Sequence, residues 1–335
     1  MPADDGLAID FDYWRRYHTP EEVEEITANS TQTMLVSGTY PIHVRLYEQR
    51  GAAATVLIAS SLLSYGLHLA RLELPFFRVG FNVVQFDLPG LGQSGGPRGG
   101  CTVPEFVQAW RDAAAFASRR FGEPLFALGV GEDGVTCYYA LANAPHIRAI
   151  SVHNLFEYGE PGSVQGQGPH WMVRAKAFGL GALSRLRPST ALDGTRIVPW
   201  EWIYGGPGDR QMIELLEQDP LSLRRVELRM AHSILERRPP PVPFEDCRTP
   251  VQVIASNRNR VCPFELVTRN YERLGGPKEL VVLEGRPQWE FNRPFHEAYC
   301  AHVMRWFEAN GAARLGVNGH EPAAAGTAAR RERRP

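Results

Sequence analysis

The chain has 335 residues, of which 44% are hydrophobic and 22% charged, and this allows a large core in one or two domains. Its formal net charge of −1 gives no electrostatic basis for binding nucleic acid or an anionic membrane. No apolar run approaches the roughly 20 residues that span a membrane, and the first residues lack the pattern of a secretory signal. The five cysteines are scattered and form no C-x-x-C pair, which indicates reduced thiols in the cytoplasm.

The chain begins with a segment, residues 1–30, in which Thr19 and Pro20 predict the start of a short helix. Residues 31–36 and 42–47 then alternate between apolar and polar side chains, which predicts a hairpin. Beyond it, short apolar runs alternate with helical patterns, so we expect a mostly parallel sheet covered by helices on both faces. These runs begin at Thr55, Phe81, Leu125, Ile147, Pro250 and Glu279.

The alternation of strand and helix patterns stops between residues 155 and 245. This stretch is rich in Gly, Pro, Arg and Trp, and we interpret it as a helical cap inserted into the sheet. The core would then consist of residues 31–154 and 246–310. Residues 311–335 contain little besides Ala, Gly and Arg and are expected to be disordered.

The most informative stretch is residues 128–134, which read LGVGEDG after an apolar run. The glycines fit G-x-G-x-x-G, the pattern of a dinucleotide-binding turn. However, the next predicted strand ends without the acid that such a turn requires, and Glu132 and Asp133 would repel a pyrophosphate. We therefore expect no nucleotide and no other cofactor.

Three further motifs support another interpretation of this turn. Residues 86–95 resemble the loop D-x-x-G-x-G-x-S, residues 257–263 resemble D-x-D-x-x-V-P, and residues 283–288 resemble L-x-G-x-x-H. In this order, over residues 31–154 and 246–308, the motifs resemble the α/β-hydrolase fold superfamily. Some members that lack the catalytic triad serve as tailoring enzymes in actinobacterial natural-product pathways. The resemblance implies an α/β-hydrolase fold with a helical cap.

The resemblance also assigns the triad positions, and none holds the expected residue. The nucleophile position falls on Gly131, the acid position on Asn259 and the histidine position on Gln288. None of these side chains can attack a carbonyl or accept a proton near neutral pH. An alternative is a displaced carboxylate nucleophile, Asp133 or Glu132, although acids are also favoured at a helix start.

The remaining candidates surround the same turn. By the resemblance, the backbone amides of Ser61 and Glu132 would form an oxyanion site, with Ser60 and Ser64 adding hydroxyls. His68, His153 and His296 are candidates for a displaced base. The expected cavity would be lined by Gly131, His153, Phe156, Trp171, Trp202, Tyr204, Gln288 and Trp289. So many aromatic residues favour a large, apolar, aromatic ligand.

Three functions follow from these candidates. The first is a cofactor-independent, non-hydrolytic enzyme that binds an aromatic or polyketide-like molecule and promotes a Michael-type addition or a related rearrangement. The second is a catalytically inactive binding protein, because the run GVGEDG resembles the serine-less turn of the N-myc downstream-regulated family. The third is a hydrolase with a displaced nucleophile. No cluster of residues has metal-ligand spacing. The sequence leaves a homodimer open.

Overall fold

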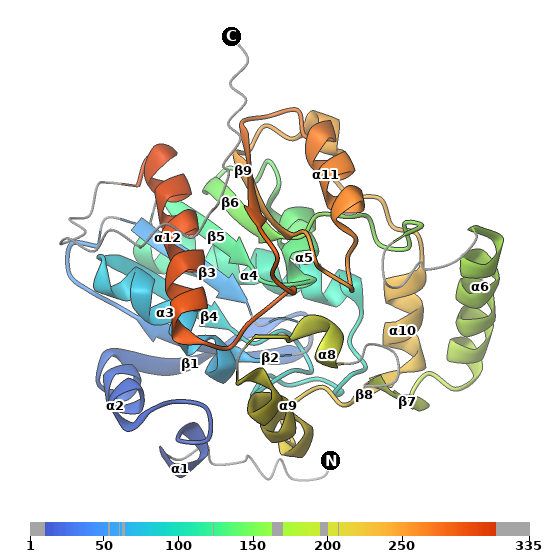
Figure 1. Cartoon of the computed structure of the whole chain (residues 1–335), viewed down its shortest axis with the longest axis horizontal. Helices are drawn as coiled ribbons and strands as arrows, with labels where there is room; N and C mark the ends of the chain where they lie inside the picture. The colour runs from blue at the N-terminus through green and yellow to red at the C-terminus, as the bar shows by residue number, and fades with distance from the viewer. Residues whose placement is uncertain are drawn as a thin grey trace.

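The computed structural model describes residues 11–52, 54–59, 61, 64–122, 124–162, 170–194, 200–206 and 208–312. These residues form a central sheet of eight strands in the order β1-β2-β4-β3-β5-β6-β9-β10 (Figure 1). The strands are β1 Ser30–Ser37, β2 Tyr40–Tyr47, β3 Ala54–Ala59, β4 Phe81–Phe86, β5 Leu125–Gly129, β6 Ile147–His153, β9 Val251–Ser256 and β10 Lys278–Leu283. Every apolar run identified in the sequence is a strand of this sheet.

The sheet is mostly parallel, as the sequence predicts. Only the β1-β2 hairpin and the β2-β4 pair are antiparallel among its described strands. The residues of β3, β4, β5 and β9 are all buried, because helices cover both faces there. Strand β10 lies at the edge and alternates between buried and half-buried residues. The α/β-hydrolase fold class is confirmed.

Two layers of helices enclose the sheet (Figure 1). Helices α3 (Gly66–Arg78) and α12 (Arg293–Ala309) cover one face. Helices α4 (Val103–Phe121), α5 (Asp133–Leu141) and α11 (Phe264–Arg273) cover the other. Each layer contributes apolar side chains to its own core cluster, so the sheet separates two cores.

The N-terminal part adds α1 (Phe11–Trp14) and α2 (Pro20–Asn29). The predicted helix start is confirmed: Thr19 accepts a hydrogen bond from the Glu22 amide, and the Glu22 carboxylate accepts one from the Thr19 amide. Glu22 also pairs with Arg71, which ties α2 to α3.

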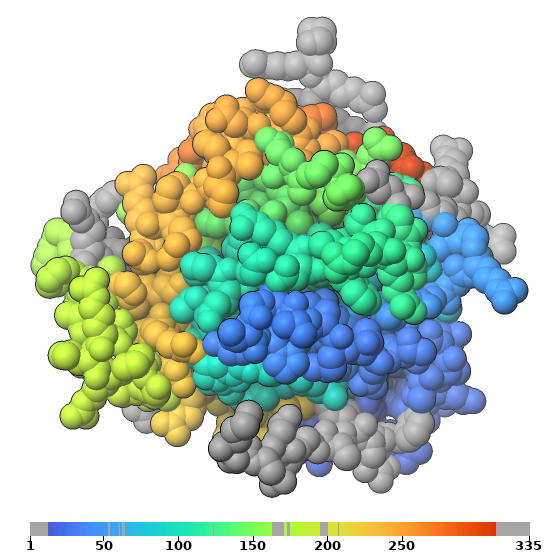
Figure 2. Space-filling view, turned by 180° about the vertical axis from the view of Figure 1, so that it is seen from behind, coloured from blue at the N-terminus to red at the C-terminus, as the bar shows by residue number. Residues whose placement is uncertain are grey.

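The segment between β6 and β9 contains α6 (His170–Leu186), α8 (Trp200–Ile203), α9 (Asp209–Gln218) and α10 (Leu228–Leu235). It also holds a two-stranded sheet of β7 (Ala191–Asp193) and β8 (Arg225–Glu227). These two strands are exposed or half-buried, so no apolar run marked them in the sequence. Helix α6 packs against α10 at the margin of the molecule (Figures 1 and 2). The proposed division into core and cap stays a prediction.

The strand order determines where a site can form. The chain leaves β3, runs through α3 to β4 on one side, and then crosses through α4 to β5 on the other side. The loops that follow β3 and β5 therefore diverge at the carboxyl edge of the sheet, where open α/β sheets bind their ligands. No helix of the described residues is long and apolar enough to cross a membrane.

Candidate functional site

Gly131 lies at a sharp turn between β5 and α5, in the left-handed conformation at φ +63°. A Cβ atom built on Gly131 would lie 3.6 Å from both Ser61 Cβ and Gln288 Nε2, so there is room in front of the turn. Gly129 and Gly134 have none, since a Cβ on Gly134 would lie 2.6 Å from the His153 carbonyl oxygen. Close packing of β5, α5 and β6 thus accounts for the outer glycines without a nucleotide.

A small cavity opens at this turn. It brings together the predicted residues Ser61, Gly131, Glu132, Tyr204, Gln288 and Trp289, and Ser64 and His68 also line it. Its volume is about 20 Å³, which accommodates about one water molecule. A polycyclic ligand therefore requires the walls to move. Ser60 lies outside the described residues.

On one side, the cavity is closed by contacts between α8 and the loop after β10. The Trp289 amide donates to the Ile203 carbonyl at 2.9 Å, and Tyr204 forms an isolated β-bridge with Trp289. The Tyr204 ring packs on Phe291 and Trp200, with ring centroids 4.5 and 5.9 Å away. A four-residue helix and one bridge thus cover the turn.

Glu132 and Gln288 form the polar side of the cavity. Gln288 Nε2 donates to Glu132 Oε1 at 3.1 Å, and both residues are buried. Burial raises the pKa of Glu132, although the hydrogen bonds from Gln288 and from its own amide lower it in part. The residue at the expected histidine position is therefore bound to a carboxyl group that can hold a proton.

Asp133 has different surroundings. Its carboxylate accepts from Trp110 Nε1 at 3.0 Å and from the Thr136 hydroxyl, and the residue is fully buried. Burial raises its pKa to about 8. Asp133 does not line the cavity, so it is poorly placed for the displaced nucleophile considered above.

Asn259 organises the loop after β9. Its Oδ1 accepts from the amides of Val261 and Cys262 at 2.8 and 2.9 Å, and its Nδ2 donates to Asn154 Oδ1 at 3.2 Å. The side chain at the expected acid position thus has a structural role in its own loop.

Two of the expected lining residues lie in the core instead. His153 is fully buried, and burial lowers its pKa to about 3. Its ring packs against Tyr299 and Trp289, and neither ring nitrogen has a hydrogen-bond partner among the described residues. Phe156 is also buried and packs on Tyr158. His153 is the last residue of β6 and Phe156 lies in the loop just after it, and neither lines the cavity.

The tryptophans of the segment between β6 and β9 are also placed elsewhere. Trp171 lies on α6 and is 70% exposed. Trp202 packs under the Arg260 guanidinium, 5.0 Å from its ring centroid. Neither lines the cavity. Of the other candidate bases, His296 is buried beside Trp289 and outside the cavity, whereas His68 lies in its wall.

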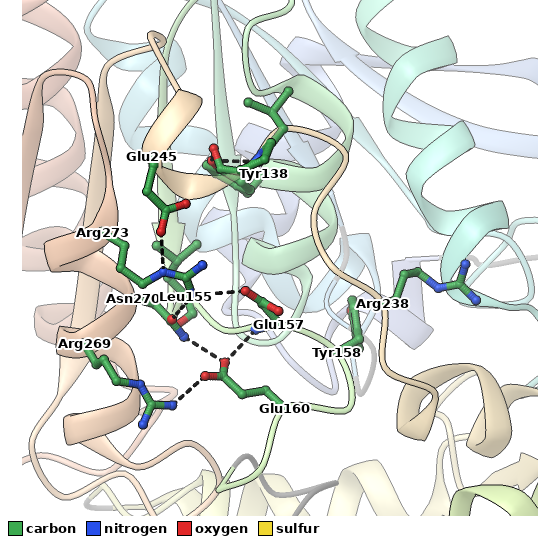
Figure 3. A network of polar contacts seen from close by, with 12 residues as sticks. Tyr138, Leu155, Glu157, Tyr158, Glu160, Arg238, Glu245, Arg269, Asn270 and Arg273 are labelled. Carbon is green, nitrogen blue, oxygen red and sulfur yellow. Dashed lines mark hydrogen bonds and ion pairs between the residues drawn. The ribbon is translucent and has the colours of Figure 1, made fainter. Parts of the chain in front are cut away.

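A larger cavity of about 330 Å³ lies elsewhere and shares no lining residue with the first. Figure 3 shows the charged network around it: Arg273 pairs with Glu157 and Glu245, and Arg269 pairs with Glu160. These ion pairs join α11 to the segment after β6. Because the arginines already have carboxylate partners, we interpret the network as structural.

The described residues contain no group of three or more His, Cys, Asp or Glu that could hold a metal ion. All five cysteines are buried free thiols. The cavity is also lined by Leu69, Val130, Ile203 and Phe291, and no local motif in the sequence marks them. Asp219, behind His68, is likewise not marked in the sequence.

A family model described as serine aminopeptidase, S33, matches residues 51–286, from before β3 to after β10. The chain belongs to this family. Solved structures with the same fold include a monoacylglycerol lipase from Paleococcus ferrophilus, 20% identical over 79% of this chain and 99% of that one, with a TM-score of 0.63. The α/β-hydrolase GrgF from Penicillium sp. sh18 is 14% identical over 84% and 99%, with a TM-score of 0.66.

The structure of DcsB with its substrate analogue also matches, at 17% identity over 84% of this chain and all of that chain, with a TM-score of 0.66. At these identities the likeness establishes the fold alone. No curated protein sequence matches significantly.

Proposed function

We propose that this chain is a non-hydrolytic enzyme of the α/β-hydrolase fold. It would polarise a carbonyl group at the turn around Gly131 and promote carbon–carbon bond formation, such as a Michael-type addition, or a related rearrangement. The backbone amides of Ser61 and Glu132 are the proposed oxyanion donors. The proposed ligand is a large, apolar, aromatic or polyketide-like molecule.

One observation carries this proposal. The turn retains the left-handed conformation and the open space of a catalytic elbow, but its side chain is absent, and Gln288 binds Glu132. The Asn259 side chain accepts hydrogen bonds from backbone amides of its own loop. Without a nucleophile and base at these positions, covalent hydrolysis through them has no route. A buried carboxyl group beside a polarised carbonyl supports proton transfer at the α-carbon instead.

The small cavity favours a second candidate, a catalytically inactive binding protein. About 20 Å³ does not admit an aromatic ring. The first proposal therefore requires that the α8 cover opens, and the two candidates differ in what happens to a bound carbonyl compound.

The test uses 1-tetralone, an apolar aryl ketone, in D₂O. We expect the protein to accelerate exchange of the α-protons, followed by NMR, above the rate in buffer. Glu132→Gln should lower this exchange at least tenfold, because it removes the carboxyl group and keeps its shape. Gly131→Leu should lower it similarly by filling the cavity. Glu214→Gln, on the exposed face of α9, is the matched control.

If 1-tetralone quenches the tryptophan fluorescence of the protein but exchanges no faster than in buffer, the binding protein is the better description. If neither binding nor exchange occurs, the aryl-ketone class is wrong.

A further inference from the structure

The cavity wall opposite Glu132 contains a second set of polar residues. Ser64 and His68 both line the cavity and are at least 90% buried. Ser64 Oγ lies 3.3 Å from His68 Nδ1, one turn along the start of α3. His68 Nε2 lies 3.8 Å from Asp219 Oδ2. A hydroxyl, an imidazole and a carboxylate thus follow one another from the cavity into the protein.

Asp219 is held firmly as an anion. Its carboxylate accepts from the hydroxyls of Tyr17 and Tyr65 at 2.5 and 2.6 Å and from the Leu221 amide at 2.8 Å, and Tyr13 donates as well. Although burial opposes ionisation, the nearby His68 ring and the hydrogen bonds from the three tyrosines hold the pKa of Asp219 well below its usual range. The carboxylate is therefore charged wherever His68 titrates.

The Asp219 anion affects which nitrogen of the His68 ring carries the proton. The Asp219 anion, 3.8 Å from Nε2, favours the tautomer of the neutral imidazole that carries its proton on Nε2. In that tautomer Nδ1 is the acceptor that faces the Ser64 hydroxyl. Burial lowers the pKa of His68, which keeps the ring neutral and able to accept a proton. The groups that face the ring are Asp219, Tyr17, Tyr65, His18 and Asp87.

We propose that Ser64, His68 and Asp219 form a proton relay that supplies the base of this site, with Ser64 as the group that contacts the substrate. A substrate proton passes to Ser64 Oγ while the Ser64 proton passes to His68 Nδ1, and Asp219 stabilises the resulting imidazolium. Asp219 is a positioning residue. The inference rests on the proposed function, for which it provides the base, and it leaves Glu132 as the proton donor.

The arrangement also implies a reactive serine. A hydroxyl bound to a base that is oriented by a carboxylate is a nucleophile, wherever it lies in the fold. A fluorophosphonate probe should therefore react at Ser64: the P–F bond breaks, a P–O bond forms with Ser64 Oγ, fluoride leaves, and the hydroxyl proton passes to His68. This reaction requires neither the natural substrate nor Glu132.

The experiment measures fluorophosphonate labelling of the full chain, with the site assigned by peptide mass spectrometry. We expect one labelled serine, Ser64. Ser64→Ala should abolish labelling, His68→Gln should slow it at least tenfold, and Ser118→Ala on the opposite helix layer should leave it unchanged. No labelling of the folded protein at pH 8, or labelling that His68→Gln does not slow, would overturn the relay.

Two further readouts separate the roles. Labelling should rise with pH through the pKa of His68, with a midpoint below pH 6.5. Asp219→Asn should move this midpoint to lower pH, because it removes the charge that favours the imidazolium, whereas a merely structural role would lower the rate without moving the midpoint. A circular dichroism spectrum checks that each variant is folded.

Exchange of 1-tetralone links the relay to the proposed function. Ser64→Ala should lower that exchange at least tenfold. If labelling fails while exchange persists, the relay is wrong and the proposed function stands. If Ser64 is labelled but no exchange occurs, the serine is reactive and the proposed function fails.

Discussion

At the scale of single residues, the turn between β5 and α5 has a glycine, Gly131, at the position where the sequence motifs predict a nucleophile. Gly131 adopts φ +63°, a conformation that costs an ordinary residue about 1–2 kcal/mol. A serine at this turn would be strained by this conformation, which would expose its hydroxyl group. Here glycine removes both the strain and the nucleophile, and the space in front of the turn remains open.

The first prediction concerns Gly131→Ser. The added Cβ fits, since its nearest neighbours would lie 3.6 Å away, but the backbone strain should lower the free energy of unfolding by about 1 kcal/mol. Hydrolysis of p-nitrophenyl butyrate should not rise above the wild-type rate, because Gln288 cannot take the hydroxyl proton and His68 Nδ1 faces the Ser64 hydroxyl instead. Urea denaturation and a spectrophotometric assay measure the two effects. A tenfold gain in hydrolysis would mean that His68 or another base accepts the proton of a hydroxyl at position 131.

At the scale of elements, the accessibility of the site depends on α8. This helix has only four residues, and the Tyr204–Trp289 bridge and the Trp289 amide connect it to the loop after β10. Such short elements open at lower free energy than the strands beneath them. The cover is therefore the part of the structure that a ligand larger than water must displace.

The second prediction is that Tyr204→Ala opens this cover. Tyr204 is buried between Trp200 and Phe291, so truncation should enlarge the cavity and lower the free energy of unfolding by about 3 kcal/mol. Quenching of tryptophan fluorescence by 1-tetralone should become at least several-fold faster in stopped flow. The control is Trp171→Phe, which alters an exposed aromatic residue on α6, outside both the cavity and α8. Equal quenching rates in wild type and Tyr204→Ala would place ligand entry elsewhere.

At the scale of the whole molecule, two buried carboxyl groups give opposite pH dependences. Asp133 has a pKa raised to about 8, so it remains protonated in the folded state while the unfolded chain ionises near pH 4. Its contribution to stability is therefore lost as the pH rises from about 4 to 8. Asp219 has a lowered pKa, so its contribution is present above about pH 4 and is lost as the pH falls.

The third prediction follows from this contrast. Asp133→Asn should gain stability relative to wild type as the pH rises from 4 to 8, on the order of 2–5 kcal/mol. Asp219→Asn should be less stable than wild type at pH 7, with a difference that shrinks below pH 4, because it weakens the hydrogen bonds that Tyr17 and Tyr65 donate to residue 219. Denaturant melts from pH 3 to 8 measure both, with exposed Asp246→Asn as control. Parallel curves for all three variants would contradict the assigned ionisation states.

The sequence by itself determined the sheet, because buried parallel strands require continuous apolar runs and each run in this chain forms a strand. It also indicated that Gly131 lies at a turn with Gln288 nearby, since both positions belong to motifs with fixed spacing. The assignment of Gly131, Asn259 and Gln288 to the triad positions stays a prediction.

Only the tertiary structure decided which other residues reach the site. Aromatic composition suggested Trp171, but its side chain is exposed on α6 and does not line the cavity at Gly131. Conversely, Asp219 lies about 150 positions from His68, and no local pattern indicates that three tyrosines would hold its carboxylate beside that ring. The periodicity of apolar residues indicates which face of a helix or strand is buried. A site depends instead on which helices and strands, distant in sequence, pack together. This arrangement is fixed by the packing of the whole chain.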